Sequence, residues 1–115
     1  MSPAEGKDSS AARRRIKEIR SRIDEFDLVC SGTLHERTKT CGKPNCRCAT
    51  DPKARHGPYF EWSWRQDGRL YHKIVSPEQA LELKQAIENY RKIQALLTRW
   101  ERESAAIILK GGKRN

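Results

Sequence analysis

The sequence has no long apolar run. Hydrophobic residues make up 36% of its 115 positions and charged residues 34%, and no stretch approaches the roughly 20 apolar residues that a membrane-spanning helix needs. The length leaves no room for a second domain of ordinary size, or for a full-sized metabolic enzyme with its own cofactor fold. We therefore expect one small domain that does not cross a membrane.

An apolar leader is also lacking, because the opening residues MSPAEGKDSSAARRR contain no hydrophobic segment of the kind that secretory signals carry. We therefore expect a cytoplasmic protein, whose thiols stay reduced. The four cysteines are then poor candidates for disulfides. Metal binding and unmodified thiols are the two remaining alternatives.

Acidic residues are too few to balance the basic ones. Lys and Arg total 24 against 15 Asp and Glu, a formal net charge of +9, which favours a polyanionic partner such as nucleic acid. Nine positive and four negative side chains fall within residues 31–75, so this zone carries most of the excess. A membrane surface is excluded as the partner, because neither predicted helix opposes a basic face to a strongly apolar one.

Two helices are predicted on either side of this zone. After a polar segment over residues 1–9, expected to be a disordered tail, apolar residues spaced three and four apart predict a helix over residues 10–27. Ser76-Pro77-Glu78-Gln79 has the pattern of a capping box, with proline at the first helical position. It starts a predicted helix over residues 77–109, which a basic tail over residues 111–115 follows.

The second helix carries a coiled-coil-like apolar seam from Leu83 to Ile107. At about 1.5 Å per residue it would be about 50 Å long, which exceeds what a 45-residue β unit can cover. The excess length must pack on the first helix, on a second copy of the chain, or on a partner.

Strands are predicted at residues 33–40, 59–65 and 69–75, with a turn-rich cysteine loop between the first two. The fold class is α+β: an N-terminal helix, a small three-stranded antiparallel sheet with a cysteine-rich loop, and a long C-terminal helix. We expect residues 10–110 to form a single domain.

The hairpin between the last two strands has two plausible registers. A two-residue loop at Asp67-Gly68 would place Trp64 opposite Tyr71, whereas a three-residue loop ending at Gly68 would place Trp64 opposite Leu70. The three-residue loop gathers the apolar side chains on one face, so we predict that register. Trp62, Trp64 and Trp100 would then pack together in the core under the long helix.

In the predicted register the other face of the sheet is polar and basic. A small sheet of this kind can enter the major groove of double-stranded DNA, where Arg and Lys contact phosphates or guanine edges. RNA remains an alternative to DNA. The residues predicted to bind nucleic acid are Arg37, Lys39, Arg65, Arg69, Tyr71 and Lys73.

The cysteine loop has the composition of a zinc site. Cys41, Cys46 and Cys48, followed by His56, would supply three thiolates and one imidazole, a complete tetrahedral set. Cys30 or His35 could replace His56 as the fourth ligand. Four ligands would close the coordination sphere, and no glutamate adjoins a ligand as a general base, so the predicted zinc is structural.

These residues also resemble a known family. The segments CGKPNCRC and HGPYF, followed by a short hairpin, a Ser-Pro-Glu helix start and ENYR, are similar to those of short uncharacterised bacterial proteins. The resemblance covers about residues 31–100. It implies that Cys41, Cys46, Cys48 and His56 form a matched set, and that the protein is associated with mobile elements and transposases. It implies no established activity.

Two functional hypotheses follow from the sequence. The first is a DNA-binding accessory module of a mobile element that uses a basic sheet face on a zinc-stapled β unit. The second is an interaction subunit that forms a homodimer or docks a transposase through residues 77–109. An enzyme is not expected, because no complete nucleophile–base pair or open metal site can be assembled from these residues.

Overall fold

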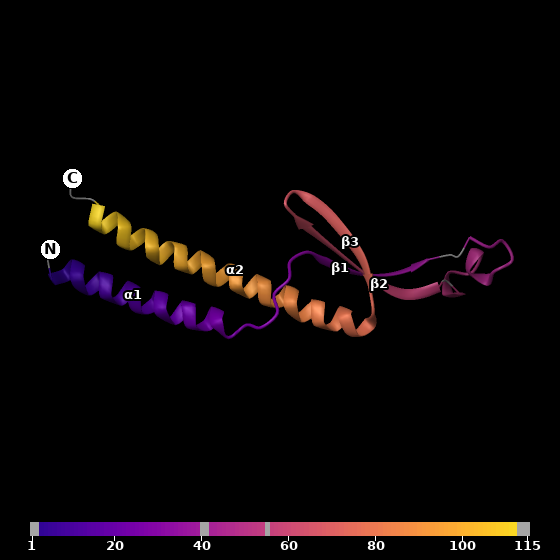
Figure 1. The fold of residues 1–115 in the computed structure, drawn as a ribbon, viewed down its shortest axis with the longest axis horizontal. Coiled ribbons are helices and arrows are strands. Elements are labelled where there is room, and N and C mark those ends of the chain that lie inside the picture. Colours follow the sequence, from indigo (N-terminus) through magenta and orange to yellow (C-terminus); the bar gives the residue numbers. More distant parts are fainter. Residues whose placement is uncertain (1–2, 40–41, 55, 113–115) are drawn as a thin grey trace. The chain divides into compact units, whose positions relative to one another are not determined.

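The computed structural model describes residues 3–39, 42–54 and 56–112. Its elements, in chain order, are α1 (Pro3–Asp24), β1 (Thr33–Lys39), two short 3₁₀ turns η1 (Arg47–Ala49) and η2 (Pro52–Ala54), β2 (His56–Gln66), β3 (Arg69–Val75) and α2 (Pro77–Gly112) (Figure 1). The strands form one antiparallel sheet in the order β1-β2-β3. The predicted α+β arrangement is therefore confirmed.

The chain divides into two compact units. The helical unit comprises Met1–Val29 and Asn89–Asn115, and the sheet unit comprises Cys30–Glu88. The length of α2 is the physical reason, because a 36-residue helix extends well beyond what a small sheet can cover. Within the described part of the chain, no helix combines the length and the apolar composition needed to cross a bilayer.

In the helical unit, α1 lies antiparallel to the later part of α2. Ile19 of α1 and Leu96 of α2 are buried. Arg15 Nε donates a hydrogen bond of 2.8 Å to Glu103 Oε2, and this pairing lowers the pKa of the Glu103 carboxyl group and raises the pKa of Arg15. The first helix thus covers one side of the seam on α2.

Both helices are longer than their patterns indicated. The sequence predicted a disordered tail over residues 1–9, yet α1 begins at Pro3, a residue that suits the first helical turn because its missing N–H would have no partner there. At the other end, α2 continues through Gly111 and Gly112. Glycine can adopt the dihedral angles that end a helix, but it can also adopt helical ones.

The start of α2 is formed as its sequence predicted. The Ser76 backbone N–H donates to Gln79 Oε1 at 2.9 Å, and the Gln79 backbone N–H donates to Ser76 Oγ at 3.0 Å. These reciprocal bonds satisfy two amide groups that the first helical turn leaves without partners, so they fix where β3 ends and α2 begins.

The predicted hairpin register is wrong. Asp67 and Gly68 both adopt positive φ angles, of 52° and 80°, and they form a two-residue loop that pairs Gln66 with Arg69 and Trp64 with Tyr71. A two-residue loop with both residues in the left-handed region matches the right-handed twist of the flanking strands. The three-residue loop was predicted because it would have placed the apolar side chains on one face. Burial did not decide the register, because Leu70 and Ile74 remain 50% and 59% exposed.

The register determines which residues share a face of the sheet. One side, here called the tryptophan face, consists of Leu34, Glu36, Phe60, Trp62, Trp64, Gln66, Arg69, Tyr71, Lys73 and Val75. The opposite side, here called the histidine face, consists of Thr33, His35, Arg37, Tyr59, Glu61, Ser63, Arg65, Leu70, His72 and Ile74. The predicted single basic face is therefore divided between the two sides.

Gly32 allows the chain to enter the sheet directly before β1. Its φ of +103° lies in a region that other residues rarely adopt, and a Cβ atom there would collide with the backbone oxygen of Ser63 and the Cβ of Trp64. The Trp62 indole N–H donates to the neighbouring Ser31 carbonyl at 2.9 Å. This close approach anchors the start of β1 against β2.

We expect Gly32→Ala to lower the free energy of unfolding by about 3 kcal/mol, because left-handed strain adds to a clash with backbone atoms. Urea denaturation followed by circular dichroism measures the change. Gly68→Ala is the matched control: its φ is +80° but nothing lies within 4 Å, so only the conformational cost of about 1 kcal/mol applies. Equal losses in the two variants would contradict the role of close packing at Gly32.

Candidate metal centre and nucleic-acid surface

Three metal-binding side chains converge in the loop between β1 and β2. The ligand atoms of Cys46, Cys48 and His56 all lie within 4.8 Å of one another. Cys48 is buried at 3% exposure, Cys46 is half-buried, and His56 is exposed. The set could therefore hold a metal ion.

Local hydrogen bonds explain how the loop brings these residues together. The Ala49 backbone N–H donates to the Cys46 carbonyl at 3.0 Å, and this turn forms η1. Asp51 then accepts the Lys53 backbone N–H at 2.9 Å through its side chain, which begins η2. The two turns return the chain to His56, the first residue of β2, which pairs with Lys39 at the end of β1.

The separation of the donor atoms suits a tetrahedral ion. Cys46 Sγ lies 3.5 Å from His56 Nε2. A zinc ion bound at about 2.3 Å from sulfur and about 2.0 Å from nitrogen would hold the two atoms roughly 3.6 Å apart. Cys30, Cys46 and Cys48 form no disulfides, so thiol groups are available to bind as thiolates. The residues present fit a structural metal ion such as zinc.

Cys41, one of the three predicted thiolate ligands, lies outside the described residues. The two alternatives that the sequence left open, Cys30 and His35, are not members of the described cluster. Cys30 precedes β1 and is tied to α2 by a 3.2 Å hydrogen bond from its backbone N–H to the Ala86 carbonyl. His35 pairs with Glu61, well along β2 from His56. The three clustered ligands therefore include the predicted His56.

The connection between β1 and β2, here called the metal loop, carries mainly positive charge. Lys43, Arg47 and Lys53 are exposed, and Asp51 is the one acidic residue between positions 42 and 56. Asp51 forms a 3.5 Å ion pair with Arg47. Among the ion pairs found within residues 3–39, 42–54 and 56–112, none engages Lys43 or Lys53.

The six predicted nucleic-acid residues do not form one surface. Arg37 and Arg65 lie on the histidine face, where Arg37 forms a 3.2 Å ion pair with Glu61. Lys39 follows an irregularity in β1 and pairs with His56. The remaining three, Arg69, Tyr71 and Lys73, lie on the tryptophan face. The register therefore does not give the sheet a single basic face that could enter a major groove.

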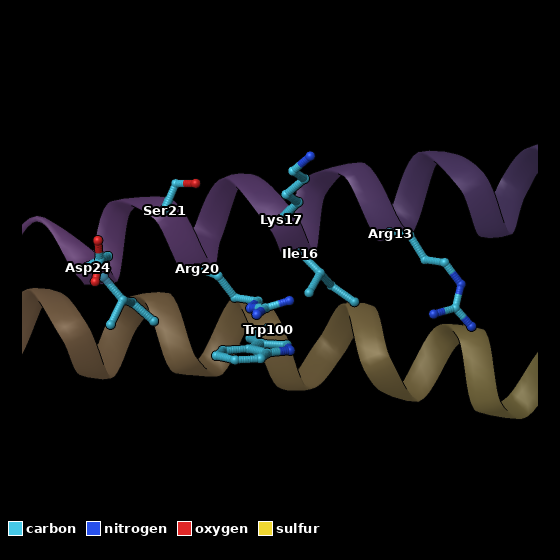
Figure 2. A pocket seen from close by; sticks show the side chains of 8 residues that line it. Arg13, Ile16, Lys17, Arg20, Ser21, Asp24 and Trp100 are labelled. Carbon is cyan, nitrogen blue, oxygen red and sulfur yellow. The ribbon is translucent and has the colours of Figure 1, made fainter.

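The sequence reasoning missed a stack of aromatic rings. Trp62 and Trp64 lie with their ring centroids 3.9 Å apart at an interplanar angle of 17°, and Trp64 continues the stack to Tyr71 at 5.5 Å and 19°. Trp100, which was expected in the same core, lies instead in the helical unit with the Arg20 guanidinium 6.0 Å from its ring centroid (Figure 2). The Asp67-Gly68 dipeptide was the signal for the stack, because its two-residue loop sets Trp64 against Tyr71.

Fold and site together define a small α+β protein with a Cys/His loop at one end of a three-stranded sheet. The chain belongs to the family described as Domain of unknown function (DUF6788), whose model matches residues 9–85. The match includes most of α1, the metal loop, the whole sheet and the start of α2. Searches of the curated proteins and of the solved structures found no match.

We expect the purified protein to bind one Zn²⁺ or Co²⁺ ion per chain, and Cys48→Ser to abolish or greatly weaken this binding because Cys48 is the buried thiol of the cluster. Metal analysis gives the stoichiometry, and thiolate charge-transfer absorption of the Co²⁺ form reports the sulfur ligands. Cys30→Ser is the matched control and should bind normally. Equal loss in both variants would contradict the assignment of the site.

Proposed function

We propose that this protein is a nucleic-acid-binding module whose sheet unit is stabilised by a structural zinc ion. The observation that carries the proposal is the convergence of Cys46, Cys48 and His56 inside a loop whose outer surface is basic. Phosphate contacts by Lys and Arg supply most of the affinity for polynucleotides. A loop held rigid by a metal presents such side chains at a lower entropic cost than a mobile one.

Zinc is proposed as the ion because its preferred ligands are thiolates and imidazole in a tetrahedral set. The proposed ligand set is the one that the sequence predicts, Cys41, Cys46, Cys48 and His56, of which Cys41 lies outside the described residues. The ion would supply folding free energy to a unit with a small core, since Val75, Ala80, Ala86 and Ile87 are the buried residues outside the loop among those that the structure describes.

Basic residues of the hairpin extend the proposed contact surface. Arg65, Arg69 and Lys73 are exposed, and they lie on both sides of the sheet. A hairpin that is basic on both sides can follow a polynucleotide backbone without entering a groove as a flat sheet. The association with mobile elements that the family resemblance implies is consistent with an accessory role beside a transposase, with DNA as the polynucleotide.

We expect the wild-type protein to bind a 20-base-pair duplex or its separated strands with an affinity that falls steeply between 50 and 200 mM salt. The double variant Lys43→Ala/Lys53→Ala should reduce the slope of log K against log salt by about 2, because each lysine contributes about 0.9 for a duplex. Fluorescence anisotropy across a salt series provides both quantities.

The variant Lys84→Ala/Lys92→Ala is the control, because it removes the same charge from exposed positions on α2. It should change the slope less than the loop variant does. An identical slope in both variants would overturn the role of the loop. No binding to any polynucleotide at low salt would overturn the whole function.

A second proposed function is self-association through the helical unit. The supporting observation is apolar surface on α2 that α1 leaves open: Leu97, Ile108 and Leu109 are 44%, 68% and 71% exposed. The groove between α1 and α2 is mainly polar, because Arg13, Lys17, Arg20, Ser21 and Asp24 line it beside Ile16, Ile23 and Trp100, so the proposal rests on the exposed apolar residues of α2. Leu97 and Ile108 lie on the same side of α2, because they are separated by about three helical turns. A second pair of helices packed on this side would complete a four-helix bundle.

We expect light scattering to show a dimer at micromolar concentration, and Leu97→Glu/Ile108→Glu to convert it to a monomer by placing charges in the apolar interface. Leu81→Glu is the control, because Leu81 is 72% exposed and lies on the part of α2 that belongs to the sheet unit. A strictly monomeric wild-type protein at high concentration would argue against this function.

A further inference from the structure

The tryptophan face carries a row of near-parallel aromatic rings. Trp62, Trp64 and Tyr71 follow one another with interplanar angles of 17° and 19°. The two tryptophans are half-buried, and Tyr71 at the end of the row is 38% exposed. A stack that ends on an accessible ring can be extended by another planar group.

Positive charge lies beside this row. Arg69 and Lys73 are the neighbours of Tyr71 on the same face of β3, and both are exposed. The acidic residue of this face, Glu36, lies on β1 at the opposite edge of the sheet. A ligand at Tyr71 would therefore meet an aromatic ring between two cations, which complements a planar base attached to an anionic backbone.

We propose that the tryptophan face binds single-stranded nucleic acid, with one base stacked on Tyr71 and the adjoining phosphates held by Arg69 and Lys73. The inference rests on the proposed nucleic-acid function and specifies its ligand. Bases in a duplex are already stacked on their neighbours, so their faces are not available to a protein ring, whereas an unpaired base can continue the aromatic stack. The half-buried tryptophans hold the row in place.

The histidine face of the hairpin also carries exposed apolar side chains. Leu70 and Ile74 are exposed on the histidine face, and a second protein chain could cover them. The tryptophan face differs because cations flank its exposed ring, and charge complementarity favours a polynucleotide there. Binding through the histidine face is therefore a distinct outcome that the test below separates.

The experiment uses the full-length protein with Trp100→Phe, so that Trp62 and Trp64 are the remaining tryptophans. The probes are dT₁₂, U₁₂ and a 12-base-pair duplex at low salt. We expect the single strands to quench tryptophan fluorescence and to bind more tightly than the duplex. Tyr71→Ala should weaken dT₁₂ binding about ten-fold, within the range measured for loss of a stacking ring, whereas Tyr71→Phe should preserve it.

Leu70→Ala is the matched control, because it removes a comparable exposed side chain from the opposite face of the same strand. It should leave dT₁₂ affinity within two-fold of the parent, and circular dichroism confirms that each variant is folded. Duplex binding that Tyr71→Ala does not alter would overturn this inference and leave the proposed function standing. Equal losses in Tyr71→Ala and Leu70→Ala would also overturn it, and absence of binding to all three probes would overturn both. The relative affinities for dT₁₂ and U₁₂ decide between DNA and RNA.

Discussion

The left-handed turn at Asp67-Gly68 is the constraint on which the sheet unit depends. Because side chains alternate between the two faces of a strand, a one-residue change in this loop would move every residue of β3 to the other side. The observed φ angles of 52° and 80° set Tyr71 beside Trp64 and Lys73 opposite Trp62. The contact of Tyr71 with Trp64 and the placement of Arg69 and Lys73 on the same face follow from this register.

At the other end of the sheet, the metal loop closes the β1–β2 connection. Cys46, Cys48 and His56 meet because two short 3₁₀ turns return the chain to the start of β2. Metal binding there and the turn at Asp67-Gly68 would hold the two ends of β2, the central strand. The proposed polynucleotide contacts lie near both ends, so rigidity at each would reduce the ordering cost of binding.

Local patterns predicted most of the elements. The capping box at Ser76, strand 69–75 and the order of helices and strands were all read from the sequence and are confirmed. Local signals suffice there because their hydrogen bonds join residues a few positions apart. The start of α1 and the end of α2 were predicted less well, since helix ends depend on weak propensities rather than on one strong contact.

The sequence alone determined the inventory of the protein: a basic β unit, two helices and a Cys/His set with metal-binding chemistry. The three-dimensional fold was needed to show that Cys46, Cys48 and His56 converge and that Trp100 belongs to the helical unit. It also placed Arg37 and Arg65 on one face of the sheet, with Arg69, Tyr71 and Lys73 on the other. Composition and spacing fix which groups are present. Their relative placement depends on the register of the hairpin. Turn geometry favoured one register and apolar burial the other, and residue types alone do not show which preference is the stronger.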